Sequence, residues 1–479
     1  MTTSTHYDAI VIGAGPNGLA AAITLASAGQ SVLIIEARET IGGGLRSAEL
    51  TLPGFLHDIC SAIHPLGAGS PFYRSIPLAD YGLKWIQPDL PLAHPLDDGT
   101  AVALDQSIEA TAANLGVDNL AYRRLMKPLV ADWEKLAPNV LGPLRLPQHP
   151  VALARFAQSA LLPAHLLAQL QFKGERAQAL FAGMAAHSIM PLGQPLTAAF
   201  GLMLGALGHV VGWPLPKGGS QQIATAMAHY FQSLGGEIVT GQPVENVAEL
   251  PSARVIMFDL TPRQVLRLAG DDLPPSYRVQ LSNYRYGPGV FKLDLAIDEP
   301  IPWRAPECRQ AGTVHLGATL NEITEAEQAV WDGQHPERPY VLVAQQSLFD
   351  DSRAPAGKHT VWAYCHVPNG STVDMSEAIE SQIERFAPGF RDTILARSQM
   401  NTVAMESYNQ NYVGGDINGG VQDIFQLYTR PALRLIPYRT PNPKYYICSS
   451  STPPGGGVHG MCGYHAAKAA LRFSLKAGK

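Results

Sequence analysis

A glycine-rich turn near the start of the chain is the feature that most constrains its fold. The turn contains Gly13, Gly15 and Gly18, and it lies between the apolar, β-branched residues 9–12 and an alanine-rich run that favours a helix. Gly13 permits a tight turn, Gly15 lets backbone N–H groups approach a phosphate, and Gly18 lets the helix pack closely on the strand. This pattern predicts a strand–turn–helix unit whose helix N-terminus faces an anion.

An acidic residue ends the next apolar run. Residues 31–36 read as a second strand, and Glu36 is at its tip. A carboxylate at this spacing can bind both hydroxyls of an adenosine ribose, and it repels a 2′-phosphate. The chain is therefore expected to bind the ADP half of a dinucleotide other than NADP.

Two further glycine clusters indicate which dinucleotide this is. Residues 42–44 follow the acidic strand end directly, and residues 455–457 lie between a predicted strand and a predicted terminal helix. A simple NAD domain continues with a helix after the acid, whereas FAD is longer and needs a further loop along its ribityl chain. A helix N-terminus near the flavin can stabilise the negative charge of the reduced ring. One FAD molecule held by both ends of the chain accounts for all three clusters.

Composition excludes several other classes of protein. The net charge of −5 gives no basic surface for nucleic acid. Five scattered cysteines without Cys-x-x-Cys spacing fit a reducing, cytoplasmic environment. His57, Cys60 and His64 lack a fourth ligand, so no metal site is expected. The first residues lack the features of a signal peptide.

The order of patterns along the chain predicts an α/β protein with two interleaved domains. A discontinuous Rossmann-like FAD-binding domain is expected from residues 1–70 with 212–275 and 430–479. A substrate domain of mixed sheet and helical cap is expected from residues 71–211 with 276–429, of which 71–211 are mainly helical. Strands are predicted at residues 237–240, 244–247, 254–259, 290–297, 340–344, 360–365 and 444–449. The most apolar run, residues 196–211, is short for a membrane span and predicts a buried helix or a surface helix that touches lipid.

Taken together, the motifs resemble those of the FAD-dependent phytoene dehydrogenase-like family, within the flavin amine oxidase-like superfamily. The shared stretches are the N-terminal glycine motif with Glu36, the segment from Gly54 to Asp58, Pro216-Lys-Gly-Gly219 and Pro454-Gly-Gly-Gly-Val458. The family includes carotenoid desaturases and the group of pyridine nucleotide-disulfide oxidoreductase domain-containing protein 2, which this chain resembles.

The resemblance implies contacts to FAD along the chain. Pyrophosphate, ribose and adenosine contacts are implied for Gly13, Ala14, Gly15, Gly18, Glu36 and Arg38. Contacts to the phosphates and ribityl chain, to adenine, and to the flavin are implied for Gly43, Gly44, Arg46, Val244, Gly456, Gly457, Val458 and His459. The family's usual arginine directly after the paired glycine is replaced by Gly44, which leaves the role of Arg46 open.

Three residues are candidates for catalysis. Residues 289–292 are similar to the stretch that carries a lysine near flavin N5 in amine oxidases, which makes Lys292 a candidate, although a lysine at a strand end can also extend to solvent. His57, beside Asp58, and His459 are candidates to face the ring, although a buried histidine more often has a structural role. Tyr408, Asn411 and Tyr412 precede two glycines and are candidates to line the pocket, although they could equally close a turn.

The predicted activity is an FAD-dependent oxidoreductase of the phytoene dehydrogenase-like type, which transfers a hydride from a hydrophobic small molecule to flavin N5. Oxygen or a quinone would be the electron acceptor. The alternatives are an amine or amino-acid oxidase, a redox-neutral isomerase or saturase, and a non-catalytic flavin-binding protein. Peripheral contact with a membrane and a homo-oligomer are both compatible with the sequence.

Overall fold

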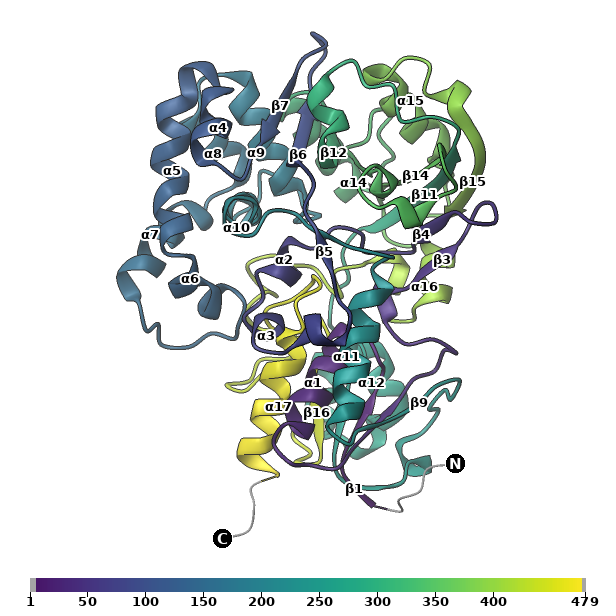
Figure 1. The fold of residues 1–479 in the computed structure, drawn as a ribbon. Coiled ribbons are helices and arrows are strands. Elements are labelled where there is room, and N and C mark those ends of the chain that lie inside the picture. The colour runs from purple at the N-terminus through teal and green to yellow at the C-terminus, as the bar shows by residue number, and fades with distance from the viewer. Residues whose placement is uncertain (1–5, 476–479) are drawn as a thin grey trace.

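The computed structural model describes residues 6–475, which form two main β-sheets, a smaller and a larger one, two separate pairs of short strands, and helices around them (Figure 1). The smaller sheet has five parallel strands in the order β16-β10-β1-β2-β9. Its strands come from three distant parts of the chain: β1 (His6–Ile12), β2 (Val32–Ile35), β9 (Glu237–Val239), β10 (Ser252–Phe258) and β16 (Tyr445–Ile447). The predicted Rossmann-like sheet is therefore confirmed.

Helices cover both faces of this sheet. One face packs against α1 (Pro16–Ala26), α11 (Gln221–Ser233) and α17 (Met461–Phe473), and the other against α12 (Pro262–Ala269) and α13 (Pro275–Ser282). Side chains alternate along each strand, so that Val11 faces the first group of helices and Ile10 faces the second.

The larger sheet has seven strands in the order β15-β11-β14-β13-β12-β6-β7. All neighbours are antiparallel except β12 and β6, which are parallel. The strands are β6 (Leu90–Pro95), β7 (Ala101–Leu104), β11 (Gly289–Ile297), β12 (Ala311–Leu316), β13 (Val341–Ala344), β14 (His359–Val367) and β15 (Ile394–Met400). One face packs against α15 (Ser376–Phe386), and the opposite face carries Leu342, Trp362 and Tyr364.

A helical cap lies beside the larger sheet (Figure 1). It consists of α4 (Ile108–Ala113), α5 (Asn119–Ala131), α6 (Trp133–Val140), α7 (Pro150–Ala160), α8 (Ala164–Gln171), α9 (Glu175–Ala186) and α10 (Thr197–Val210). Most of α10 is buried, as expected for the most apolar run. Among residues 6–475 no single helix is long and apolar enough to cross a membrane, although the bent pair α7–α8 passes by length and composition.

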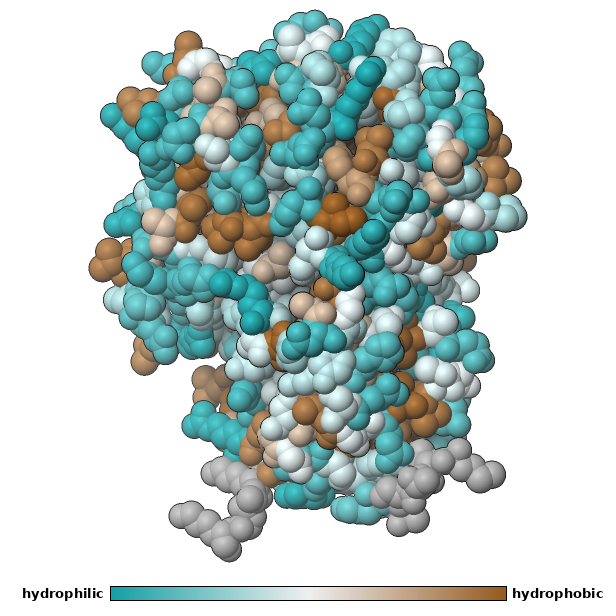
Figure 2. Space-filling model, viewed as in Figure 1, coloured by the Kyte–Doolittle hydropathy of each residue, from teal (hydrophilic) through white to brown (hydrophobic). Residues whose placement is uncertain are grey.

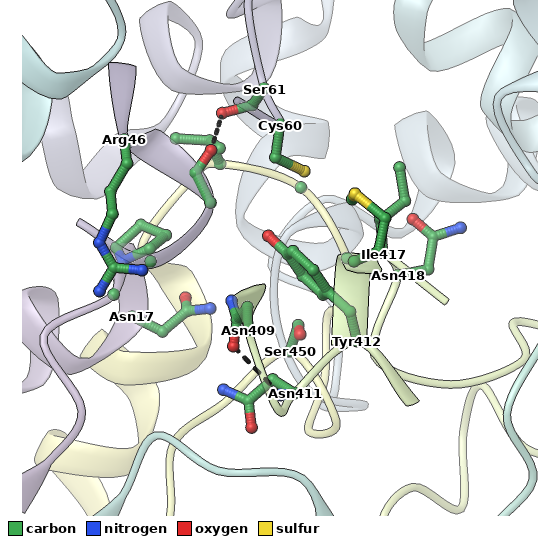
Figure 3. A pocket seen from close by; sticks show the side chains of 18 of the residues that line it. Asn17, Arg46, Cys60, Ser61, Asn409, Asn411, Tyr412, Ile417, Asn418 and Ser450 are labelled. Atoms are coloured by element: carbon green, nitrogen blue, oxygen red, sulfur yellow. Dashed lines mark hydrogen bonds between the residues drawn. The ribbon is translucent and has the colours of Figure 1, made fainter. Parts of the chain in front are cut away.

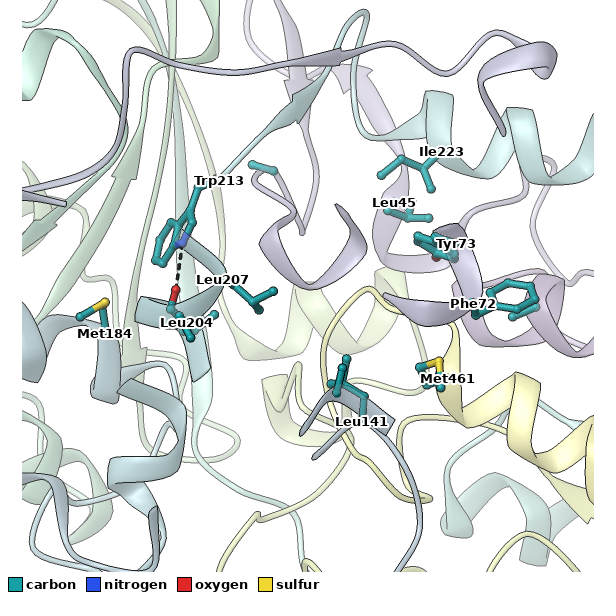
Figure 4. Packing of buried hydrophobic residues seen from close by; sticks show 14 of the residues in the cluster. Leu45, Phe72, Tyr73, Leu141, Met184, Leu204, Leu207, Trp213, Ile223 and Met461 are labelled. Carbon is teal, nitrogen blue, oxygen red and sulfur yellow. Dashed lines mark hydrogen bonds between the residues drawn. The ribbon is translucent and has the colours of Figure 1, made fainter. Parts of the chain in front are cut away.

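One hydrophobic cluster joins the cap to the parallel-sheet unit. Figure 4 shows Leu141 and Leu207 of the cap region in one cluster with Phe72, Tyr73 and Met461, and Met461 begins α17 of the parallel-sheet unit. The buried apolar contacts of this cluster hold the two parts together. The outer surface, by contrast, is mostly hydrophilic on the face in Figure 2, with scattered hydrophobic groups.

The expectation of a mainly helical stretch at residues 71–211 was wrong for residues 85–104. This segment forms β5 (Trp85–Ile86), β6 and β7, and β6 pairs with β12 more than 200 residues later. A short apolar run gives the same pattern for a buried strand and a buried helix. The strand predicted at residues 244–247 is also absent, and a 3₁₀ turn begins at Val247 instead. The domain boundaries themselves stay a prediction.

Candidate functional site

A cavity of about 370 Å³ takes its walls from both sheets and the cap. At one end lie the carboxyl ends of β1, β2 and β10, and at the other lie β11, β13, β14 and α10. Open crevices at the carboxyl ends of parallel strands are where nucleotides bind in α/β proteins. The predicted glycine motif and the predicted lysine therefore share one cavity.

The dinucleotide end is built as the glycine motif predicts. Gly13 has φ +102°, and a Cβ at Gly18 would lie 2.1 Å from the Gly13 carbonyl oxygen, so both positions require glycine. Gly15 is the N-cap of α1 and lines the cavity, which puts the helix N-terminus against its wall. Gly13 also lines the cavity, whereas Ala14 and Gly18 lie behind the wall.

Glu36 lines this end and is held by three protein donors. Its Oε2 accepts the N–H of Ala14 at 2.8 Å, and its Oε1 accepts from the Arg38 N–H at 2.9 Å and the Arg46 guanidinium at 3.1 Å. Arg38, Arg46 and Val244 line the cavity as well. Arg46 also lies over the Tyr408 ring, 5.5 Å from its centroid. The structure thus gives Arg46 a role that the sequence left open: it orients Glu36.

A carboxylate that the sequence did not single out lies beside the glycine motif. Asp259 follows β10, lines the cavity, and accepts the Gly18 N–H at 2.9 Å. A Cβ at Gly15 would lie 2.7 Å from its Oδ2. Burial raises the pKa of Asp259 to about 7, against the lowering effect of the Gly18 N–H, and Glu36 raises it further. Its position after a buried strand was the only available sequence signal.

The middle of the cavity is formed by two loops (Figure 3). Gly43 and Gly44 lie on one side, and the Tyr408 hydroxyl donates to the Gly43 carbonyl oxygen at 2.6 Å. Asn411 accepts the Thr261 N–H and donates to the Asp259 carbonyl oxygen, each at 2.9 Å. This loop therefore ties the end of β10 to the second glycine cluster. The prediction that Tyr408, Asn411 and Tyr412 line the pocket is confirmed.

The C-terminal glycine loop reaches the same cavity, but His459 does not. Gly456, Gly457 and Val458 line it. The His459 ring instead accepts the Met461 N–H at 3.0 Å, and its carbonyl oxygen accepts from Ser70 at 2.6 Å. Its side chain is 1% exposed. The expected contact of the His459 side chain with the flavin is therefore corrected: the ring supports the start of α17.

Lys292 lines the cavity, and His57 lies behind it. The Lys292 ammonium donates to Asp294, two residues along β11, and lies 5.8 Å from the Trp362 ring centroid. Burial raises the pKa of Asp294 to about 6 although Lys292 lowers it. His57 Nε2 is 2.8 Å from the Thr51 hydroxyl, and Nδ1 is 3.6 Å from Asp294.

Burial lowers the pKa of His57 to about 3, so its ring is neutral. Asp58 is bound by Arg353, Ser47 and Ser220, away from the cavity. The expectation that His57 faces the flavin ring is therefore corrected, because its imidazole is enclosed by protein groups and does not line the cavity.

The far end of the cavity is apolar and aromatic. Its lining includes Ile189, Phe200, Met203, Leu204, Trp213, Leu342, Trp362 and Tyr364. The rings of Trp362 and Tyr364 meet edge to face at 5.0 Å. His187 and Thr313 are polar residues at this end that no sequence motif indicated. Within the described chain the only carboxylates that line the cavity are Glu36 and Asp259, both at the dinucleotide end.

The family follows from comparison with known proteins. The family model described as flavin containing amine oxidoreductase matches residues 17–460. The chain belongs to this family. Membership makes the protein a flavin-dependent oxidoreductase, and the dinucleotide motif identifies the flavin as FAD. The predicted family, fold class and cofactor are confirmed.

Two curated relatives extend this result. Pyridine nucleotide-disulfide oxidoreductase domain-containing protein 2 of Rattus norvegicus is 26% identical, with 98% of this chain and 94% of the relative covered. Phytoene dehydrogenase of Streptomyces griseus is 25% identical, with coverage of 81% and 77%.

Solved structures with the same fold cover nearly the whole chain. An oxidoreductase from Methanosarcina mazei has a TM-score of 0.65 at 17% identity, with 97% of this chain and 99% of that chain covered. Putrescine oxidase bound to putrescine has a TM-score of 0.62 at 18% identity, with coverage of 98% and 99%. At these identities the likeness concerns the fold.

Proposed function

We propose that the protein binds FAD along the first part of the cavity and oxidises an uncharged, hydrophobic small molecule at its far end. FAD held there would supply the hydride acceptor, N5, and the route for electrons to oxygen or a quinone. The observation that carries the proposal is the continuity of one cavity from the glycine motif to an apolar chamber without a carboxylate.

The residues present fit the cofactor. Gly15 and the start of α1 would face the pyrophosphate, because the N–H groups and the helix dipole there favour an anion. Glu36 would bind the ribose, and Val244 would lie against adenine. Gly43, Gly44 and residues 456–458 would hold the ribityl chain and the flavin.

Lys292 is the candidate catalytic residue. Its ammonium lies in the cavity wall, and Asp294 and the Trp362 ring hold it in place. It can keep a proton at Nζ close to a substrate or to a water molecule. The surrounding apolar side chains exclude bulk water, which strengthens electrostatic interactions at this end.

Relatives support a hydrophobic substrate, and one feature favours the amine alternative. One curated relative is named for phytoene. The perpendicular Trp362 and Tyr364 rings offer π-faces that can attract an ammonium group. An ammonium substrate at this end would nevertheless find no lining carboxylate in the described chain, and it would lie near the charge of Lys292.

Anaerobic mixing of the FAD-loaded protein with squalene, 1-decanol or decylamine tests the proposal. We expect an uncharged compound to bleach the flavin absorbance. Bleaching by decylamine alone would establish the amine oxidase alternative. Conversion of a polyene to an isomer without bleaching would establish the redox-neutral one.

The Lys292→Met variant tests the proposed residue in the same experiment. We expect it to retain FAD and to reduce or reoxidise the flavin more slowly, by about 100-fold if the lysine acts in proton transfer. Unchanged rates in both half-reactions would remove Lys292 from the mechanism.

A further inference from the structure

Two polar side chains lie at the apolar end of the cavity, and neither the FAD contacts nor Lys292 explains them. His187 follows α9, and Thr313 lies on β12. Both line the cavity beside Leu204, Trp213 and Leu342. Polar groups in an apolar chamber lose hydration, so they are retained only where something compensates for the loss.

Thr313 has an unused hydrogen-bonding group. Its side chain is buried, with 2% exposure, and its hydroxyl has no hydrogen-bond partner among the described residues. A buried hydroxyl without a partner is unfavourable, typically by about 1–3 kcal/mol. A ligand oxygen in the cavity would satisfy it.

His187 has one nitrogen engaged and one left over. Its Nε2 lies 3.0 Å from Nε2 of His315, and this is its only side-chain hydrogen bond within the described chain. The ring packs perpendicular to Trp213 at 5.7 Å, which fixes its orientation. Burial lowers the pKa of His187 to about 3, and the pKa of His315 also falls well below its ordinary value. The pair is therefore neutral, and Nδ1 of His187 remains for a ligand.

His187 belongs to a group of three neighbouring histidines, and the other two, His94 and His315, are closed to the cavity. His94 Nε2 donates to the Ala318 carbonyl oxygen at 2.9 Å, and burial lowers the pKa of His94 to about 4. His94 and His315 are both fully buried, and neither lines the cavity. His187 is thus the member of the group that meets a ligand.

The sheet register relates this polar pair to Lys292. Lys292 is opposite Tyr364, Tyr364 is opposite Leu342, and Leu342 is opposite His315. Three strand spacings of about 4.8 Å place the two ends of this row roughly 14 Å apart. Thr313 lies on the same face of β12 as His315, two residues earlier. Between the polar pair and Lys292 the wall is aromatic and aliphatic.

We propose that His187 and Thr313 form an anchor for one uncharged oxygen function, a hydroxyl or a carbonyl, at the end of an otherwise apolar substrate. The anchor fixes how far the substrate enters, and so selects which carbon lies near Lys292. This inference rests on the proposed function and goes further by naming the substrate class. Substrates that are pure hydrocarbons would leave both groups unpaired.

Isothermal titration calorimetry of the FAD-loaded protein with 1-decanol, 2-decanone, 1-decene and decylamine tests the anchor. We expect 1-decanol or 2-decanone to bind about five- to tenfold more tightly than 1-decene, the gain of one or two neutral hydrogen bonds. The stronger of the two identifies the oxygen function.

Substitutions then assign the effect to the anchor. Thr313→Val keeps the side-chain shape, and His187→Phe keeps a ring against Trp213. Each should reduce the preference for the oxygenated ligand at least threefold while leaving 1-decene binding unchanged. Thr360→Val is the matched control: Thr360 is another buried threonine of the same sheet with an unpartnered hydroxyl, but it does not line the cavity. The Thr360→Val variant should change neither the affinity for the oxygenated ligand nor the affinity for 1-decene.

The outcomes separate this inference from the proposed function. Equal binding of 1-decanol, 2-decanone and 1-decene by the wild type, or an unchanged preference in Thr313→Val, overturns the anchor and leaves the hydrophobic chamber intact. Binding of decylamine alone overturns the proposed function itself.

Discussion

At the scale of single residues, Asp259 sets a condition on cofactor binding. It lies beside Gly15 and Gly18, where the pyrophosphate is expected, and its raised pKa of about 7 makes it neutral below that pH. The other groups that face it are Glu36, Tyr73, Cys448 and Cys462. Burial raises the pKa of the tyrosine and of both thiols, so these three are neutral, and only Glu36 adds charge.

We therefore expect FAD affinity to fall as the pH rises through 7. Above that pH Asp259 is ionised in the free protein. The negative pyrophosphate of FAD would then lie beside a negative carboxylate, so binding requires Asp259 to take up a proton. One linked proton changes the dissociation constant by up to about tenfold per pH unit. Fluorescence titration of the apoprotein with FAD between pH 6 and 9 measures this.

Asp259→Asn should bind FAD with an affinity that changes little over this range. Asp98→Asn removes the same charge from a remote exposed site and should behave as the wild type does. A wild-type affinity that is independent of pH would mean that Asp259 stays in one protonation state.

At the scale of elements, strand β11 carries a buried ion pair between two positions of the same face. Lys292 and Asp294 are 2% and 1% exposed. Removing one partner leaves the other charge uncompensated in an apolar setting, and replacing both with apolar residues avoids that cost.

Lys292→Met should therefore lower the free energy of unfolding by about 3 kcal/mol. The double variant Lys292→Met/Asp294→Leu should recover most of this loss while remaining slow in catalysis. Urea unfolding of the three proteins, followed by circular dichroism, distinguishes these cases. A double variant as unstable as the single one would show that the pair has a further structural partner, for which His57 is the candidate at 3.6 Å from Asp294.

Elements with a clear local pattern could be predicted, among them strands β11 and β14, whereas the order in which strands pair and the strand β6 could not. The turn after β1, the acidic end of β2 and the glycine loop before α17 each combine a strand, glycines and a helix within a short stretch. β6 gave no such signal, because its short apolar run fits a buried strand and a buried helix equally, and its pairing with β12 arises only in the fold. The site divides in the same way. Motif residues such as Gly15 and Gly456 line the cavity, whereas Asp259, His187 and Thr313 reach it through tertiary packing alone.

At the scale of the whole molecule, the cofactor end of the cavity depends on the two ends of the chain coming together. The N-terminal helix α1 packs on the C-terminal helix α17. A Cβ added at Gly463 of α17 would lie 1.8 Å from the carbonyl oxygen of Asn17, and Asn17 lines the cavity. The distance between these two helices is therefore coupled to the shape of the cofactor site.

Gly463→Ala should force the two helices apart, because the obstructing atom belongs to the backbone and cannot rotate away. We expect the free energy of unfolding to fall by about 3 kcal/mol and FAD to bind at least tenfold more weakly, since Asn17 moves with α1. Gly270→Ala is the control, because a Cβ there meets nothing within 4 Å and its φ of −58° suits alanine. Thermal unfolding with and without FAD, combined with FAD titration, measures both effects. Loss of stability without loss of FAD affinity would mean that the helix contact supports the fold alone, and that the N-terminal glycine turn holds its geometry independently of α17.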